Sequence, residues 1–155
     1  MIKIPLHQTS SPVRLQSKAI KIMAKTILCP IDFSESSIHA LKWAAELSAQ
    51  YNCHLTVLYP YRLLQAGKED VLQVKKKNED SALQKFELLE KEYLNGKTVS
   101  FDFIPEVGFL SDRIEDHLRK NSVLLMVIGK NMNSASQENL GDLITNVKVP
   151  IVVVP

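Results

Sequence analysis

The 155-residue chain lacks several features that would assign a protein to a class at once. It has two cysteines, Cys29 and Cys53, whose spacing fits neither a zinc site nor a disulfide framework, so we expect buried thiols in a reducing compartment. No apolar run approaches the roughly 18 residues that span a bilayer, and we expect a soluble, cytoplasmic protein without a membrane partner. The five glycines form no G-x-x-x-x-G-K-[ST], G-x-G-x-x-G or G-x-S-x-G pattern. These absences argue against the common NTPase, dinucleotide-binding and serine-hydrolase classes.

Most of the chain also lacks a strong excess of positive or negative charge. The formal net charge is +2, but residues 1–22 carry four basic residues and no acid, which leaves the remainder at −2. In that remainder the basic run Lys75–Lys77 is interpreted as a solvated helix face. A nucleic-acid-binding domain needs a basic stripe with interleaved aromatics, so we predict no nucleic-acid partner.

The first 24 residues differ in character from the rest. We interpret residues 1–24 as a flexible N-terminal extension and residues 25–155 as one domain. A transit-like segment and a start codon assigned too early, ahead of Met23, stay open as alternatives.

From Thr26 onward, short apolar runs alternate with helical periodicity, which is typical of βαβ units on a parallel sheet. The third strand alternates apolar and polar residues, which predicts an edge position. We expect the second helix to be mobile or partly unwound around residues 75–80, where core residues are scarce. The expected strands are 26–31, 55–59, 99–104, 123–128 and 150–155, the expected helices are 34–52, 69–94, 111–120 and 142–147, and a loop is expected at 60–67.

The first helix has a clear apolar stripe. Its predicted buried residues are Ile38, Leu41, Ala45 and Ser48, which recur at helical spacing. We interpret its two aromatic residues, Trp43 and Tyr51, as packing residues.

The four histidines show no catalytic or metal-binding arrangement in the sequence. We predict no catalytic residues and no metal, because the histidines lie in unrelated settings. His117, with Asp112 and Asp116, is assigned to the wet side of the third helix as a solvated charge cluster.

Specific residues then point to a known family. The segment Thr26–Ala49, TILCPIDFSESSIHALKWAAELSA, closely resembles the opening strand and helix of the universal stress protein family. Later segments of that family's pattern follow in order at Leu55–Tyr59, Glu106–Gly108, Val123–Gly129 and Pro150–Pro155. The resemblance covers residues 25–155. It implies an open five-stranded parallel sheet of order 3-2-1-4-5 with helices on both faces, a Rossmann-like α/β fold of the adenine nucleotide alpha hydrolase-like kind.

Such a sheet has a crevice where the strand order reverses, at the carboxyl ends of its first and fourth strands. In nucleotide-binding members of the family, the adenine and ribose lie against residues that match Pro30–Asp32 and Leu55 here. Asp32 has a second interpretation of equal weight, as the acceptor of a turn or cap before Ser34. The candidate cofactor-binding residues are Pro30, Ile31, Asp32, Leu55, Gly129, Lys130, Asn131 and Gly141, and ATP is the possible cofactor.

The family's triphosphate loop follows the fourth strand with the pattern G-x-x-G-x9-G-[ST], because glycines let backbone amides approach phosphate oxygens. Here Gly129 matches the first glycine, but Met132 stands at the second and Asp142 follows Gly141. Aligned backward from Pro150, Gln137–Glu138 takes the Gly-Ser place. An acid there would repel phosphate by about 1 to 4 kcal/mol at a separation of ~4 Å.

Other residues of this loop favour phosphate binding. Lys130 supplies a positive charge, and small polar side chains could replace backbone donors. The small polar residues are Asn131, Asn133, Ser134 and Ser136.

The resemblance implies a dimeric regulatory module of the stress response that is not an enzyme and that has a degenerate nucleotide site with weak or no ATP binding. An ATP-binding switch with slow hydrolysis is the alternative. An adenylating enzyme of the ATP pyrophosphatase type is more remote, because Ile31–Ser37 lacks the glycines of that class's S-G-G-x-D-S loop. In the family the last strand pairs with its two-fold mate, which implies a homodimer through Ile151–Val154, and the protein partners are unknown.

Overall fold

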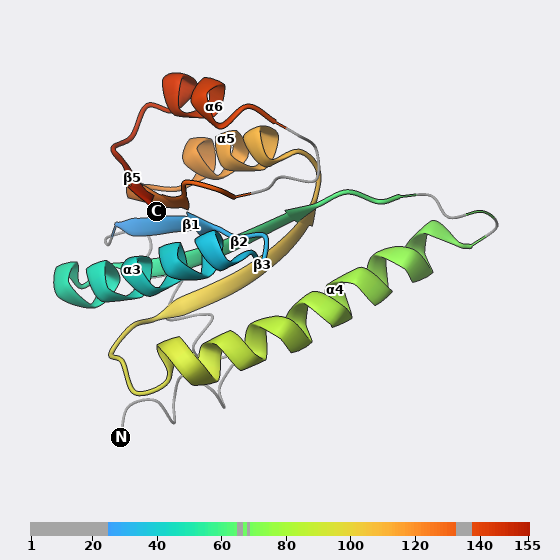
Figure 1. Ribbon diagram of the computed structural model, residues 1–155, viewed down its shortest axis with the longest axis horizontal. Coiled ribbons are helices and arrows are strands. Elements are labelled where there is room, and N and C mark those ends of the chain that lie inside the picture. The colour runs from blue at the N-terminus through green and yellow to red at the C-terminus, as the bar shows by residue number, and fades with distance from the viewer. Residues whose placement is uncertain (1–24, 65–66, 68, 133–137) are drawn as a thin grey trace.

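The computed structural model describes residues 25–64, 67, 69–132 and 138–155. The predictions for residues 1–24, and those for Asn133, Ser134, Ser136 and Gln137, lie outside the described residues. Five strands form one parallel sheet in the order β3-β2-β1-β4-β5, as predicted (Figure 1). The elements are β1 (Thr26–Pro30), α3 (Glu35–Tyr51), β2 (His54–Tyr61), α4 (Val71–Leu89), a π-helical turn η1 (Glu90–Leu94), β3 (Phe101–Val107), α5 (Leu110–Lys120), β4 (Val123–Gly129), α6 (Leu140–Asn146) and β5 (Ile151–Val154).

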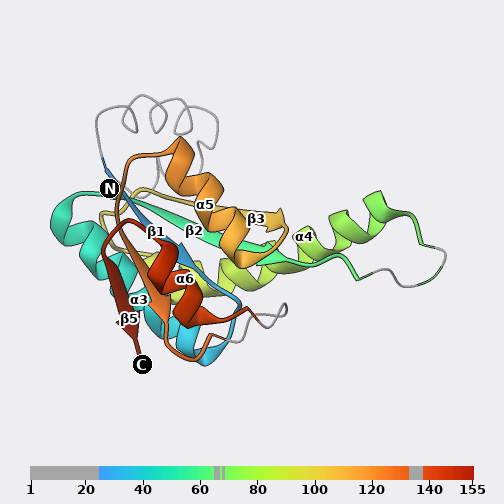
Figure 2. The same cartoon turned by 90° about the horizontal axis from the view of Figure 1, so that it is seen from above.

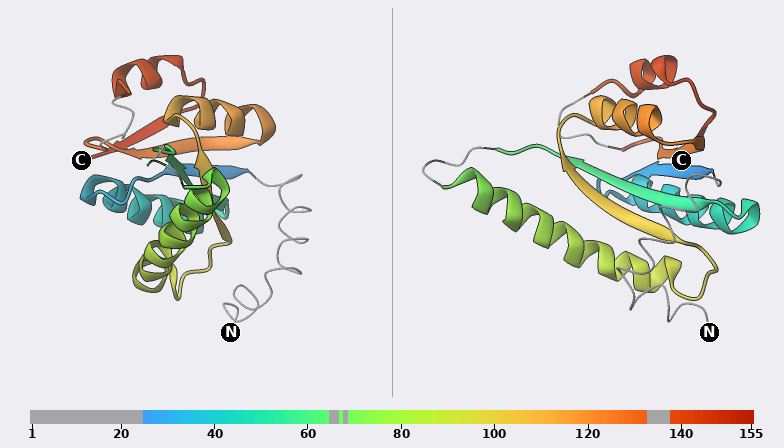
Figure 3. Two further views of the ribbon diagram at one scale, coloured as in Figure 1. Left: turned by 90° about the vertical axis from the view of Figure 1, so that its right-hand side faces the viewer. Right: turned by 180° about the vertical axis from the view of Figure 1, so that it is seen from behind.

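Two helices cover each face of the sheet. Helices α3 and α4 lie on one face and α5 and α6 on the other (Figures 2 and 3). Successive residues of β1 alternate between the two cores, because side chains of a strand point to opposite faces. Ile27 and Cys29 belong to the core under α3, and Leu28 belongs to the core under α5. Both cysteines are buried and free, as predicted, and burial raises the pKa of both thiols.

Helix α3 lies close to the sheet through small side chains. Ser34 caps its start and Asn52, in the left-handed conformation, ends it. Ile38 is only partly buried, because the contact is centred on small residues that allow close approach. Trp43 and Tyr51 are 57% and 60% exposed, so their interpretation as packing residues is wrong. The buried residues are Ser36, Ser37, Ala40, Leu41, Ala44, Ala45 and Ser48.

Helix α4 is continuous through residues 75–80, so the predicted unwinding is wrong, and the predicted mobility stays a prediction. Asp70 caps the helix, and Lys75 and Glu79 form an ion pair one turn apart. The Tyr61 hydroxyl also donates a hydrogen bond to Glu79 at 2.9 Å. This half of α4 is poor in core residues because it projects past the sheet (Figure 1).

Strand β2 is longer than predicted. Pro60 and Tyr61, assigned to a loop from the sequence, pair with Glu106 and Val107 of β3. The loop toward α4 therefore begins after Tyr61.

Strand β3 is an edge strand, as predicted, although it begins at Phe101 instead of Val99. Leu55 N donates to Ser100 O and Gly108 N donates to Tyr61 O, each at 2.9 Å. Backbone groups alternate along a strand, so the nitrogen of Pro105 faces away from β2. Proline is tolerated at that position because no ladder hydrogen bond needs its missing N–H.

Among the described helices, none combines the length and apolar character that crossing a membrane requires.

Candidate functional site

The turns that follow β1 and β4 meet at the first turn of α3. Asn131 N donates to Ser36 Oγ at 2.9 Å, and Asp32 N donates to Ser37 Oγ at 3.2 Å. Since Ser36 and Ser37 are consecutive, the two turns are held side by side. The geometry therefore agrees with the prediction that these two turns meet where the strand order reverses.

Gly129 allows β4 to approach α3 closely. A Cβ at this position would lie 2.5 Å from Ser36 Oγ and 2.6 Å from the Ser36 carbonyl oxygen. No side chain fits in that space, so packing alone explains the glycine.

Among the described residues after β4, four backbone amides already have acceptors within the protein. Lys130 N donates to Val154 O at 2.6 Å, and Met132 N donates to Gly129 O at 3.3 Å. Asn131 N is bound by Ser36, as described above. Gly141 N donates to Asn139 Oδ1 at 2.8 Å, which caps α6. A phosphate would have to displace these acceptors.

Glu138 places a carboxylate where an anion would otherwise be attracted. Its two carboxylate oxygens accept from Leu110 N at 2.7 Å and Ser111 N at 3.0 Å, at the start of α5. Free amides and the helix dipole make such a start favourable for negative charge. Glu138 therefore occupies the amino end of α5.

The carboxylate of Asp32 serves the turn that leads into α3. Asp32 Oδ1 accepts from Ser34 N at 3.0 Å and also from Ser34 Oγ. This is the turn role that the sequence had left open. The pKa of Tyr59 on β2 is raised, mainly by burial and to a smaller extent by the negative charge of Asp32.

Aromatic side chains surround the Asp32 turn, and sequence reasoning missed them. Phe33 has a φ of 64°, in the left-handed region that residues other than glycine rarely adopt. Its ring meets Tyr59 edge-on at 4.9 Å and lies 6.3 Å from Phe103, while Lys85 Nζ lies 5.5 Å from its centre. Aromatic faces beside polar groups are surfaces on which nucleobases stack. The available signal was the presence of aromatics in or just after three neighbouring strands, at Phe33, Tyr59 and Phe103.

The other predicted site residues are distributed unevenly. Pro30 and Ile31 are fully buried, so their side chains belong to the core. Leu55 lies near the amino end of β2, opposite Ile27, and is not brought to the crevice. Lys130 is exposed, as are Asn131 and Gly141.

His54 belongs to a polar network that sequence reasoning also missed. Its Nδ1 lies 3.0 Å from Ser100 Oγ and its Nε2 lies 2.8 Å from Asp102 Oδ1. Thr56 donates to the same carboxylate oxygen at 3.1 Å. With the His54 side chain 3% exposed, the network satisfies a buried ring and joins β2 to the edge strand. The signal was the alternation of Ser100 and Asp102 with phenylalanines at the start of β3.

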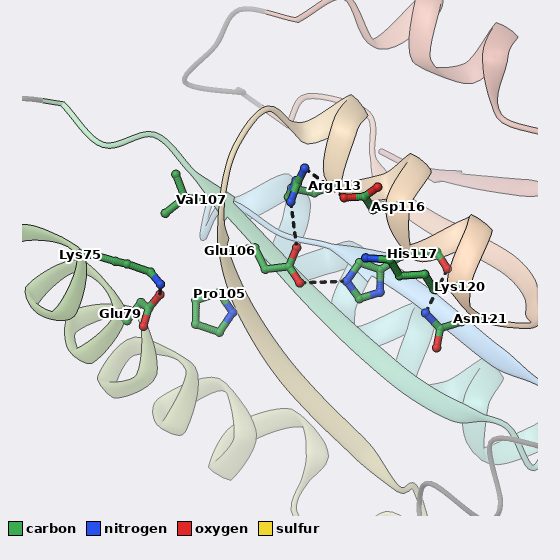
Figure 4. Close-up of a pocket in the computed structure, with 10 residues that line it drawn as sticks. All are labelled: Lys75, Glu79, Pro105, Glu106, Val107, Arg113, Asp116, His117, Lys120 and Asn121. Carbon is green, nitrogen blue, oxygen red and sulfur yellow. Dashed lines mark hydrogen bonds and ion pairs between the residues drawn. The ribbon is translucent and has the colours of Figure 1, made fainter. Parts of the chain in front are cut away.

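A polar cavity of about 390 Å³ lies between α4, the carboxyl end of β3 and α5 (Figure 4). Glu106 lies at its centre, 3.3 Å from His117 Nε2 and 3.8 Å from Arg113 Nη1. His117 is 14% exposed and faces β3, so its assignment to the wet side of the helix is wrong. The interactions of Glu106 determine this orientation. Within the described residues, no group of three or more His, Cys, Asp or Glu side chains could hold a metal.

Comparisons with known proteins agree with this fold. A protein of the universal stress protein family from Burkholderia pseudomallei shares 19% identity and a TM-score of 0.68, over 86% of this chain and 97% of that one. A universal stress protein in complex with cAMP shares 16% identity and a TM-score of 0.60, over 84% of this chain and 96% of that one. A universal stress protein from Archaeoglobus fulgidus in complex with dAMP shares 18% identity and a TM-score of 0.56, over 85% of this chain and 98% of that one. A comparison with curated protein sequences finds no match.

The model of the universal stress protein family matches residues 23–155, which is most of the chain. The match includes the turns at Asp32 and Gly129 and all five strands. The chain therefore belongs to the universal stress protein family.

Proposed function

We propose that this chain is a dimeric regulatory module of the stress response, without an enzymatic role, whose crevice binds ATP weakly or not at all. The observation that carries the proposal is the internal use of the amides of Lys130, Asn131, Met132 and Gly141. Each hydrogen bond of this kind contributes about 1 kcal/mol net. A triphosphate would have to replace several of them, and Asp142 lies beside the last.

The alternative is an adenine-nucleotide switch, and the Asp32 turn favours a version of it with a short phosphate group. Phe33 and Tyr59 offer aromatic faces beside the Asp32 carboxylate, which suit a base and a ribose. Two relatives are described in complex with cAMP and dAMP, which carry one phosphate. A monophosphate needs fewer donors from the loop after β4 than ATP does.

Calorimetry with ATP and with AMP tests both proposals. We expect no ATP binding tighter than millimolar, and any AMP binding to be tighter than that of ATP. Asp32→Ala should weaken AMP binding. Ser34→Ala is the matched control, because it removes the hydroxyl that donates to Asp32 Oδ1 but keeps the carboxylate. A micromolar dissociation constant for ATP that Asp32→Ala weakens would contradict the main proposal.

The dimer would form through β5. This strand is the second edge of the sheet, Val153 is 41% exposed, and an apolar edge left bare invites pairing. On α3, which contacts β5, Trp43 and Tyr51 are also exposed. Sedimentation should show a dimer that Val153→Lys converts to a monomer and that Leu72→Lys, an equivalent change on α4, leaves intact. A wild-type monomer would refute this assembly.

A further inference from the structure

A groove of about 910 Å³ lies between α5 and α6, on the face of the sheet opposite α3. Two apolar stripes face each other across it, one from each helix, and Val149 continues its floor toward β5. Each stripe repeats with helical spacing, as a buried helix face does. The stripes are Leu110, Ile114 and Leu118 from α5, and Leu140, Leu143 and Val147 from α6 and its end. Leu110, Ile114 and Leu143 are buried in the core of this face, so Leu118, Leu140 and Val147 are the partly exposed members.

The groove stays open because both ends of α6 are anchored. Apolar helix faces normally interdigitate at interaxial distances of about 8–10 Å. Here Glu138, just before α6, is bound to the start of α5. After α6, Pro150 O accepts from Met126 N at 2.9 Å and fixes the chain to β4. The seven-residue helix between these anchors makes sparse backbone contacts with α5 and the sheet.

The size and lining of the groove are those of a ligand site. Small-molecule pockets are mostly apolar clefts of about 300–1,000 Å³ with a few polar groups that orient the ligand. This groove has an apolar floor and a charged mouth, so an amphipathic molecule fits it better than a purely polar one.

The mouth is acidic. Four carboxylates and two cations line it, a net charge of −2. One of the cations, Arg119, forms an ion pair with Asp116 outside the groove. Among the described residues no ion pair holds Asp112, Glu115 or Asp142, so these carboxylates can receive a cation.

We propose that the groove binds a small cationic amphiphile, a molecule with an alkyl or aryl body and one ammonium group. The body covers the partly exposed members of the stripes, Leu118, Leu140 and Val147, and the ammonium group lies among the carboxylates at the mouth. This proposal does not rest on nucleotide binding or on the dimer, although Met132, Glu138 and Asp142 of the segment after β4 also line the groove.

Displacement of a neutral fluorescent probe, N-phenyl-1-naphthylamine, from the full chain tests the headgroup. Decyltrimethylammonium and decanoate have tails of equal length and are used below their micelle concentrations. We expect the cation to displace the probe at a concentration at least tenfold lower than the anion. Equal displacement by both, preference for decanoate, or no probe binding would overturn the proposal.

Variants then test the location. Leu140→Trp fills the groove and should abolish probe binding, whereas Ile144→Trp, on the exposed side of the same helix, should leave it unchanged. The double variant Asp112→Asn and Glu115→Gln should reduce the preference for the cation about tenfold and keep the probe bound. Both of these residues are exposed, so we expect the double variant to fold. It therefore tests the location of the headgroup even where Leu140→Trp does not fold. An unchanged headgroup preference would contradict the site.

Discussion

The two faces of the sheet are covered by helices in different ways. On one face, α3 lies so close to β4 that a methyl group at Gly129 would overlap Ser36. On the other face, α6 stands away from α5, and a groove of about 910 Å³ separates their apolar stripes. Both helices turn an inner face toward the sheet, so the helical pattern alone does not account for the difference.

Side-chain size and helix length account for it instead. Helix α3 has 17 residues and presents mainly alanine and serine to the sheet, which allows the backbones to approach. Helix α6 has seven residues, and leucines dominate its inner face. A short helix with bulky side chains and fixed ends cannot fill the space above the sheet.

The largest expected effect compares one leucine on each face. Leu41→Ala, on the inner face of α3, should lower the free energy of unfolding by about 4 kcal/mol, because a closely packed site cannot collapse around the cavity. Leu143→Ala, beside the groove, should cost about 2 kcal/mol, because water already reaches its surroundings. Urea unfolding of both variants measures the difference. Equal costs would mean that α6 is packed as closely as α3.

A smaller effect tests the close approach itself. Gly129→Ala should cost about 2–3 kcal/mol, since its methyl group overlaps backbone atoms of Ser36. Gly141→Ala, in the first turn of α6, is the control and should change stability by less than about 1 kcal/mol. Adding Ser36→Gly to Gly129→Ala should restore little of the lost stability, because much of the overlap is with the Ser36 backbone. Full recovery would show that the hydroxyl alone sets the distance.

The sequence predicted the fold because the fold depends on local patterns. Alternating apolar runs and helical stripes gave the strands and helices, and the resemblance gave their order. The meeting of Asp32 with the turn after Gly129 then followed from topology alone. A glycine that admits a phosphate and a glycine that admits a neighbouring helix look identical in a sequence, so the packing role of Gly129 required coordinates.

Other features depend on contacts between distant segments. The network of His54, Ser100 and Asp102 requires the register of β2 with β3, which no local pattern specifies. His117 faces inward because Glu106 of β3 lies beside it. The groove beside α6 depends on how far a short helix stands from its neighbour, and periodicity gives no distance.

The position of Pro105 limits how many copies strand pairing could join. Its ring occupies an outward-facing place in the second half of β3, so an added strand would find no donor there. If two copies join through β5, the outer rims of the joined sheet are both β3. Growth by further strand addition is disfavoured at those rims, which makes the assembly self-limiting at two copies.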